Sequence, residues 1–234
     1  MPDGSATLFA VTDVELLQAW RAGDALAGQR LIKRHYQSVY LFFFGKVGAE
    51  ASEDLTQTTF ETLCERVDDF RGESALRTFL FGIARWKLVR HFERARAGER
   101  PFEPLSDSVY DPGVERSMTS MLAAREHEIL LVQALRRLPL DDQLLLELKD
   151  YEGLTARELA EVFDIPPGTV ASRLQRARER LKDAATRLAT HPRLLEHTLT
   201  NLERHMRQIR LSLAGGPEEK KIDQSSTATD SIDA

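Results

Sequence analysis

Three polar side chains in the last third of the chain have the spacing of a DNA-reading helix. Ser172, Arg173 and Arg176 lie on or near the outer side of a segment whose apolar residues recur every three or four positions, which predicts an amphipathic helix from about Thr169. The guanidinium fork of arginine matches the O6 and N7 atoms of guanine, or two phosphate oxygens. These residues could therefore recognise base edges or phosphates. The apolar positions are Val170, Leu174, Ala177 and Leu181.

A shorter helix is predicted immediately before this one. Thr155 can cap its first N–H groups, and Glu158, three residues later, completes a capping box. The stretch 164–168 (DIPPG) ends the helix, because proline removes a backbone donor and disfavours helical angles in the residue before it. Two short helices with a tight turn predict a helix-turn-helix whose second helix enters the major groove. The alternative is a solvated, positively charged helix face in an ordinary bundle.

A second group of residues suited to nucleic acid lies earlier in the chain. Aromatic residues alternate with basic residues between positions 70 and 97, where a helix is predicted from about Ala75. Aromatic faces stack on unpaired bases while cations follow the phosphate backbone, which is how single strands are commonly held. Each aromatic residue could instead belong to the core. The aromatic residues are Phe70, Phe81, Trp86 and Phe92.

The charge distribution supports two separate basic surfaces. The net charge is −5 over 234 residues, which is unusual for a nucleic-acid binder. However, residues 70–100 carry 8 Lys and Arg against 3 Asp and Glu, and residues 170–187 carry 6 against 2. We therefore expect the chain to contact DNA at two places within an otherwise acidic molecule.

A helix predicted from Ser52 or Glu53 carries a polar stripe of Asp54, Gln57 and Glu61. It could be an ordinary solvated surface or a contact for a partner. A nuclease site built on Asp54, Glu61 and Asp68 is a weaker hypothesis, because no convergent histidine or further carboxylate accompanies them. The sequence predicts no catalytic residue, no metal ligands and no cofactor.

The remaining pattern predicts an all-α protein with several helices around two cores. Helices are expected at about 13–23, 24–46, 52–67, 75–97, 115–138 and 141–151, with an extended linker at 101–113 that is rich in Pro, Ser and Asp. A helix over 192–214 has a coiled-coil-like apolar seam. We expect this seam to pack on the protein itself, with self-association or a partner as the alternative. Residues 215–234 should be disordered.

Composition sets the remaining limits. Cys64 is the single cysteine, which excludes a disulfide framework and a cysteine-based zinc cluster and favours a reducing cytoplasm. The start of the chain lacks the features of a signal peptide, and its longest apolar run, at 39–44, is too short to cross a bilayer. We therefore expect a cytoplasmic protein that does not enter a membrane.

Three blocks of sequence resemble the sigma-70 family of bacterial transcription initiation factors, and more closely its extracytoplasmic-function (ECF) group. The first is 53–60 (EDLTQTTF), similar to the family's polymerase-binding segment. The second joins 70–74 (FRGES) to 78–84 (TFLFGIA), similar to the segment that reads and melts the minus-ten element. The third joins 135–139 (LRRLP), 151–155 (YEGLT) and 167–178 (PGTVASRLQRAR), similar to the reader of the minus-thirty-five element. Together the blocks are more specific than a helix-turn-helix alone.

The resemblance implies a role for each group of residues. Core RNA polymerase, through the clamp coiled coil of its largest subunit, would be bound by Asp54, Gln57 and Glu61. Minus-ten DNA, with a flipped-out base of the melted strand, would be held by Phe70, Arg71, Gly72, Ser74, Arg77, Trp86, Lys87 and Arg90. Minus-thirty-five duplex DNA would be read by Thr169, Ser172, Arg173, Gln175 and Arg176. The protein would catalyse nothing itself, and an anti-sigma factor is a further possible partner.

The same resemblance implies a domain organisation. Region 2 would span 12–98, the linker 99–114, region 4 115–187, and a helical extension 188–214, followed by the tail 215–234. The main alternative function is a stand-alone helix-turn-helix regulator, which would bind duplex DNA without polymerase. Two departures from the family pattern stand out. Trp86 occupies a position where asparagine is common, and the extension lies beyond the usual family core, where we expect it to modulate availability or polymerase engagement.

Overall fold

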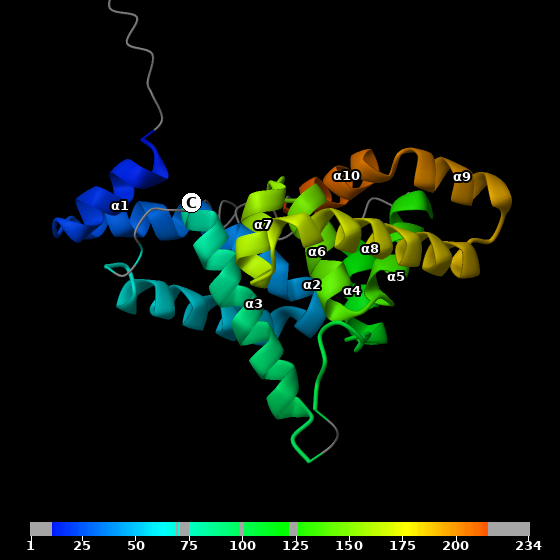
Figure 1. Cartoon of the computed structure of the whole chain (residues 1–234), viewed down its shortest axis with the longest axis horizontal. Coiled ribbons are helices and arrows are strands. Elements are labelled where there is room, and N and C mark those ends of the chain that lie inside the picture. Colours follow the sequence, from blue (N-terminus) through cyan, green and yellow to red (C-terminus); the bar gives the residue numbers. More distant parts are fainter. Residues whose placement is uncertain (1–10, 69, 71–74, 99–100, 122–125, 215–234) are drawn as a thin grey trace, which may run out of the picture.

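The computed structural model describes residues 11–68, 70, 75–98, 101–121 and 126–214. These residues form an all-α fold, as predicted, with ten helices. Outside the helices, the described residues form one isolated β-bridge, between Ser108 and Pro139. Figure 1 shows how the helices pack. Their bounds are α1 (Asp13–Arg21), α2 (Ala25–Glu65), α3 (Leu76–Ala95), α4 (Pro112–Met121), α5 (Glu126–Arg136), α6 (Leu140–Asp150), α7 (Ala156–Phe163), α8 (Pro167–Leu188), α9 (Pro192–Thr200) and α10 (Leu202–Ala214).

The long helix α2 is two helical segments joined at Gly48. The backbone there has φ +77°, a conformation that suits glycine because it has no Cβ. The hydroxyl of Ser52 donates a hydrogen bond to the Gly48 carbonyl and restarts the helix. The sequence predicted two helices with a gap between Lys46 and Ser52. The structure confirms the break but confines it to one residue.

The described residues 101–111, between α3 and α4, contain no helix, as predicted, but they turn at 104–106 and are docked on the protein. Phe102 and Asp107 are buried, and the Asp107 carboxylate accepts a hydrogen bond from Arg96 at 3.2 Å. The N-terminus of α6 has no side-chain cap. The carbonyls of Pro104 and Asp107 instead accept its first N–H groups, each at 2.9 Å. The linker thus satisfies backbone donors that would otherwise lack a partner.

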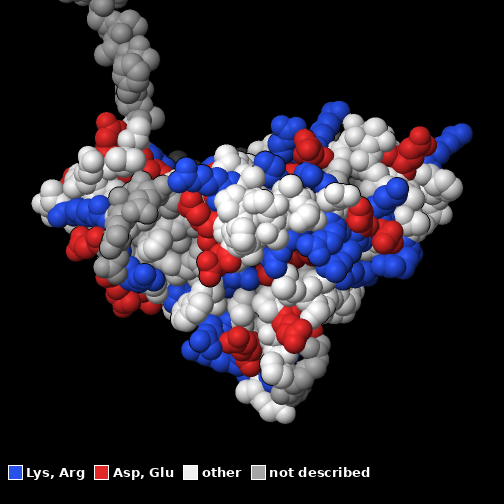
Figure 2. All heavy atoms as spheres, in the orientation of Figure 1, with Lys and Arg blue, Asp and Glu red and all other residues white. Residues whose placement is uncertain are grey.

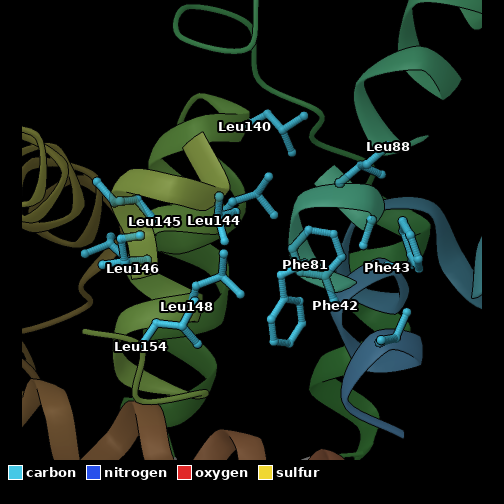
Figure 3. Close-up of a cluster of buried hydrophobic side chains, with 14 of the residues drawn as sticks. Phe42, Phe43, Phe81, Leu88, Leu140, Leu144, Leu145, Leu146, Leu148 and Leu154 are labelled. Carbon is cyan, nitrogen blue, oxygen red and sulfur yellow. The ribbon is translucent and has the colours of Figure 1, made fainter. Parts of the chain in front are cut away.

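A single apolar core joins the amino-terminal helices to the helix-turn-helix. Figure 3 shows Phe42, Phe81 and Leu88, from α2 and α3, facing Leu144 and Leu148 of α6. All five side chains belong to one buried cluster. Every residue of α6 from Leu140 to Leu148 is buried, because neighbours cover it on all sides. The two halves of the chain are therefore packed together and not merely tethered.

The carboxyl-terminal extension folds back over both halves. Met206, Ile209 and Leu213 of α10 are buried in the common core, which confirms that the apolar seam packs on the protein itself. The prediction of one helix over 192–214 is wrong, because the helix breaks at Asn201 (φ −112°, ψ 26°) into α9 and α10. This break allows α10 to contact α2, α4, α5 and α6. None of the helices in the described ranges combines the length and apolar character needed to cross a bilayer.

Candidate polymerase and nucleic-acid interfaces

The acidic stripe on the second segment of α2 is exposed. Asp54, Gln57 and Glu61 all face solvent, three and four residues apart on one face of the helix. The amide of Gln57 donates a hydrogen bond to Glu61 Oε1 at 2.9 Å. The structure thus brings the three predicted polymerase-binding residues together on an accessible surface.

The basic face of α3 surrounds an exposed tryptophan. The Trp86 side chain is 55% exposed, and the cations of Lys87 and Arg90 lie 5.8 and 5.6 Å from its ring centroid. Trp86 and Lys87 also line an open groove of about 610 Å³ together with Phe79, while Glu161 of α7 closes one side. An exposed aromatic ring with flanking cations is suited to stacking on an unpaired base.

Phe70 occupies a different position from that of an exposed base-stacking residue. It is buried, and its ring lies 5.3 Å from that of Phe79. The guanidinium of Arg21 donates a hydrogen bond to the Phe70 carbonyl. The Phe70 ring is therefore packed on the core and not presented to a base in this structure. Arg71, Gly72 and Ser74, which were predicted to contact minus-ten DNA, lie outside the described residues.

The predicted recognition helix α8 exposes most of its polar residues. Ser172, Gln175 and Arg176 face solvent, and Thr169 is half-buried at the start of the helix. Their side chains make local bonds, such as Gln175 to Glu179 Oε1 at 3.1 Å. Basic side chains gather along α8 in the right half of Figure 2. This surface matches the expected duplex-reading face.

The two basic helices are linked through carboxylates of the helix-turn-helix half. Arg77 of α3 pairs with Glu158 of α7 at 3.1 Å and donates a hydrogen bond to the Glu152 carbonyl at 3.1 Å. Burial raises the pKa of Glu158, but hydrogen bonds from Thr155 and Arg77 outweigh it and hold the pKa below its ordinary value. Arg77, predicted to hold DNA, is thus engaged within the protein. Figure 1 shows α3 lying beside α7.

Asp141 at the start of α6 joins both DNA-reading helices directly. Its carboxylate receives two hydrogen bonds from Arg85 of α3, each at 3.0 Å, and lies 4.0 Å from Arg173 of α8. The Arg85 guanidinium also covers the ring of Phe163 at 5.0 Å. Burial raises the pKa of Asp141, and the two arginines act against that shift. Arg173 is therefore turned toward Asp141 of α6 and not fully available to DNA.

Comparison with known proteins identifies the family. A family model described as Sigma-70 region 2 matches residues 31–98, and one described as Sigma-70, region 4 matches residues 121–181. The chain is 30% identical over 181 residues to the ECF RNA polymerase sigma-E factor of Haemophilus influenzae, covering 74% of this chain and 95% of the relative. The chain belongs to the ECF group of the sigma-70 family. The sigma factor binds core RNA polymerase and directs promoter-specific transcription initiation, reading minus-ten and minus-thirty-five elements.

Other relatives agree with this assignment. The sigma factor is 29% identical over 177 residues to the ECF RNA polymerase sigma-E factor of Escherichia coli K12, covering 72% of this chain and 92% of that relative. Among solved structures it resembles CnrH, determined in complex with the cytosolic domain of CnrY, with a TM-score of 0.52 and 21% identity over 74% of this chain and 96% of that one. This structural likeness concerns the fold alone.

The residues that connect the two halves of the sigma factor were not identified from its sequence. Arg85 was counted only among the charges of the first basic surface, Asp141 only as the start of a helix, and Glu158 only as part of a capping box, which it also forms. Its spacing from Thr155 carries the capping signal, but no local spacing relates Glu158 to Arg77. The extension formed by α9 and α10 lies beyond the residues that the region 4 family model matches.

Proposed function

We propose that this structure is a closed form of the sigma factor, in which region 2 and region 4 restrain each other's DNA-reading helices. The observation that carries the proposal is the Asp141 carboxylate, which contacts Arg85 of α3 and Arg173 of α8. Arg77 is held in the same way by Glu158. Charges that would contact phosphates are therefore partly neutralised by the protein itself.

The spacing of the promoter elements supports the need for opening. Their positional names place them about 25 base steps apart, or about 85 Å along B-form DNA at about 3.4 Å a step. Two arginines that share one carboxylate lie within a few ångströms of it, at 3.0 and 4.0 Å. Region 2 and region 4 must therefore separate before both elements are occupied together.

The polymerase-binding surface has the opposite character, since it is exposed in the closed form. We propose that Asp54, Gln57 and Glu61 contact core polymerase first and that this binding favours separation of the two regions. After separation, the minus-ten strand is held by Arg71, Gly72, Ser74, Arg77, Trp86, Lys87 and Arg90, and Phe70 supports this surface through its packing on Phe79 within region 2. The minus-thirty-five duplex is read by Thr169, Ser172, Arg173, Gln175 and Arg176.

The same proposal covers the compartment and the chemistry of the protein. It acts in the cytoplasm beside polymerase and contributes promoter specificity and strand opening without catalysing a reaction of its own. An anti-sigma partner stays a prediction of the family resemblance. Such a partner would act by favouring the closed form or by covering the acidic stripe. The stand-alone regulator is disfavoured, because it gives no role to region 2.

The test uses two neighbouring aspartates. Asp141→Asn weakens the contact between the regions, whereas Asp142→Asn removes a pairing with Arg180 that lies within region 4. Both side chains are buried, so the two substitutions are matched. Spin labels at Gln29→Cys and Asp183→Cys in a Cys64→Ser background report the distance between the regions by pulsed electron resonance, with and without core polymerase.

In the free wild-type protein we expect one narrow distance distribution, which shifts when core polymerase binds and the regions separate. Asp141→Asn should show a shifted or broader distribution without polymerase, and Asp142→Asn should resemble the wild type. The closed form would be refuted as a resting state if polymerase-bound wild type kept the distribution of the free protein, or if Asp141→Asn and Asp142→Asn could not be told apart.

A further inference from the structure

Three histidines from three different helices meet at the junction of region 4 and the carboxyl-terminal extension. His127 lies in α5, His197 in α9 and His205 in α10. One ring nitrogen of each lies within 4.8 Å of the others. The ring centroids of His127 and His205 are 4.1 Å apart, and His197 is 5.2 Å from each.

The hydrogen bonding of His205 is unusual for a core histidine. The residue is 5% exposed, and its Nδ1 atom is buried without a hydrogen-bond partner. A buried polar atom in this position ordinarily costs free energy, so it indicates a ligand or an unfulfilled interaction. An unprotonated imidazole nitrogen that lacks a hydrogen-bond partner offers its lone pair to a metal ion.

We propose that His127, His197 and His205 bind one divalent transition-metal ion of the zinc class. Imidazole nitrogens suit zinc, cobalt, nickel and copper, and three protein ligands leave a fourth position for water. Nitrogens about 2.1 Å from a tetrahedral ion lie about 3.4 Å apart, so small side-chain rotations suffice to close the site. Glu128 is buried beside the cluster, with its Oε1 atom 3.9 Å from His127 Nε2, and offsets the charge of the ion.

A bound ion would fasten the extension to region 4. His197 and His205 lie on the two helices that follow the break at Asn201, and His127 lies near the start of α5. At its other end, α10 reaches both regions: Arg210 pairs with Glu152 at 2.8 Å and donates a hydrogen bond to Ser38 of α2 at 2.8 Å. The ion would therefore stabilise the helix that bridges the closed form.

The full-length protein, stripped of metal with a chelator and dialysed, is titrated with Co²⁺ and with Zn²⁺. Visible absorption reports the geometry around Co²⁺, and calorimetry reports the Zn²⁺ affinity. His197→Gln is the first variant, because the residue is exposed and its replacement leaves the core intact. His127→Gln is the second. The control is His191→Asn, which removes an imidazole of the same extension but retains a residue able to cap α9.

We expect one ion per wild-type chain, tetrahedral Co²⁺ absorption, and an increase in melting temperature with Zn²⁺. His127→Gln and His197→Gln should weaken binding by at least about tenfold and abolish the thermal shift, while His191→Asn should match the wild type. Equal affinities for wild type and His197→Gln would overturn the proposal. So would the absence of a saturable Co²⁺ signal in wild-type protein whose folding is confirmed by circular dichroism.

Discussion

Two buried cations share one carboxylate where region 2 meets region 4. Glu147 of α6 pairs with Lys46 of α2 and with Arg136 of α5, and all three side chains are almost fully buried. Arg136 also donates a hydrogen bond to the Gly45 carbonyl at 2.6 Å. When both bases are protonated, the trio carries one net positive charge in a medium of low polarity. Removing the anion and removing one cation should therefore have unequal effects.

Glu147→Gln leaves two buried cations facing a neutral amide. We expect it to lower the free energy of unfolding by about 3–5 kcal/mol. Lys46→Met leaves Arg136 and Glu147 as a balanced pair and fills the same space with an apolar chain, so it should be neutral or stabilising. Urea unfolding followed by circular dichroism measures both. Equal losses for the two variants would contradict this account of the trio.

The pH dependence of the free energy of unfolding provides a second test of the same three residues. Burial, reinforced by Arg136 and Arg210, lowers the pKa of Lys46 well below its ordinary value of 10.5. A base whose pKa is lower when folded opposes folding while protonated, so its contribution to stability rises with pH between the folded pKa and 10.5. Wild type should therefore gain stability relative to Lys46→Met as pH rises through this window. A difference that stays constant with pH would contradict the lowered pKa.

Trp86 is the exposed aromatic residue of region 2 best placed to meet an unpaired base. Trp86→Ala should weaken binding of single-stranded minus-ten DNA to the holoenzyme by about 1–3 kcal/mol, or about 5- to 150-fold. Fluorescence anisotropy with a labelled non-template oligonucleotide measures the loss. Leu26→Ala is the control, because Leu26 is 62% exposed on α2 and does not line the α3 groove. Comparable losses in both variants would argue against stacking.

At the residue scale, the sequence predicted which side chains are exposed better than it predicted which residues they contact. Periodicity correctly placed Gln57, Glu61 and Arg176 on exposed faces. The family resemblance assigned Arg77 and Arg173 to DNA, and the structure pairs them with Glu158 and Asp141. A residue's face follows from helical period, whereas its neighbour depends on how distant helices pack. The histidine cluster has the same character, since His127 and His197 are 70 positions apart.

At the scale of elements, local signals predicted helix starts well. The capping boxes at Thr12 and Thr155 are both formed, and Gly48 interrupts α2 between the two predicted helices. The break at Asn201 was missed because the apolar seam continues through it without a change of spacing. Tertiary packing explains the difference, since α10 turns to reach several helices at once. Local propensity does not encode that choice.

The contribution of α10 packing to the free energy of unfolding can be measured with two neighbouring apolar residues of that helix. Ile209 is fully buried, whereas Leu211 is 65% exposed. Ile209→Ala should lower the free energy of unfolding by about 2–5 kcal/mol through lost burial and a cavity. Leu211→Ala should change it by less than about 0.5 kcal/mol. Thermal and urea unfolding compare the variants, and similar losses at both positions would show that α10 does not dock as described.

At the scale of the whole molecule, the sequence predicted two helical units and a linker, and the structure adds that they share a core. The signal was present in α6, where residues 140–148 include acidic side chains and are nevertheless all buried. Charged residues inside a helix ordinarily suggest a solvated face, and the sequence predicted only a helix at 141–151 without its burial. The arginines that neutralise Asp141 and Asp142 lie on α3 and α8, far away in sequence.

A shared core predicts cooperative unfolding of the free protein. Because Phe42 and Phe81 pack against the leucines of α6, neither region can unfold without exposing apolar surface of the other. Differential scanning calorimetry should show one transition, with calorimetric and van't Hoff enthalpies that agree. Two resolved transitions, one for each region, would mean that the regions are independent in solution.

The carboxylate shared by Arg85 and Arg173 should also affect how the unbound protein is distributed between chromosomal DNA and solution in a cell. A genome offers about 10⁶–10⁹ non-specific sites, and unpaired basic helices are drawn to all of them. Here the chain supplies its own anions to both helices while leaving Asp54 and Glu61 exposed. We therefore expect the unbound factor to bind non-specific DNA more weakly than it would with both regions separated. We expect it to bind core RNA polymerase first and promoter DNA second.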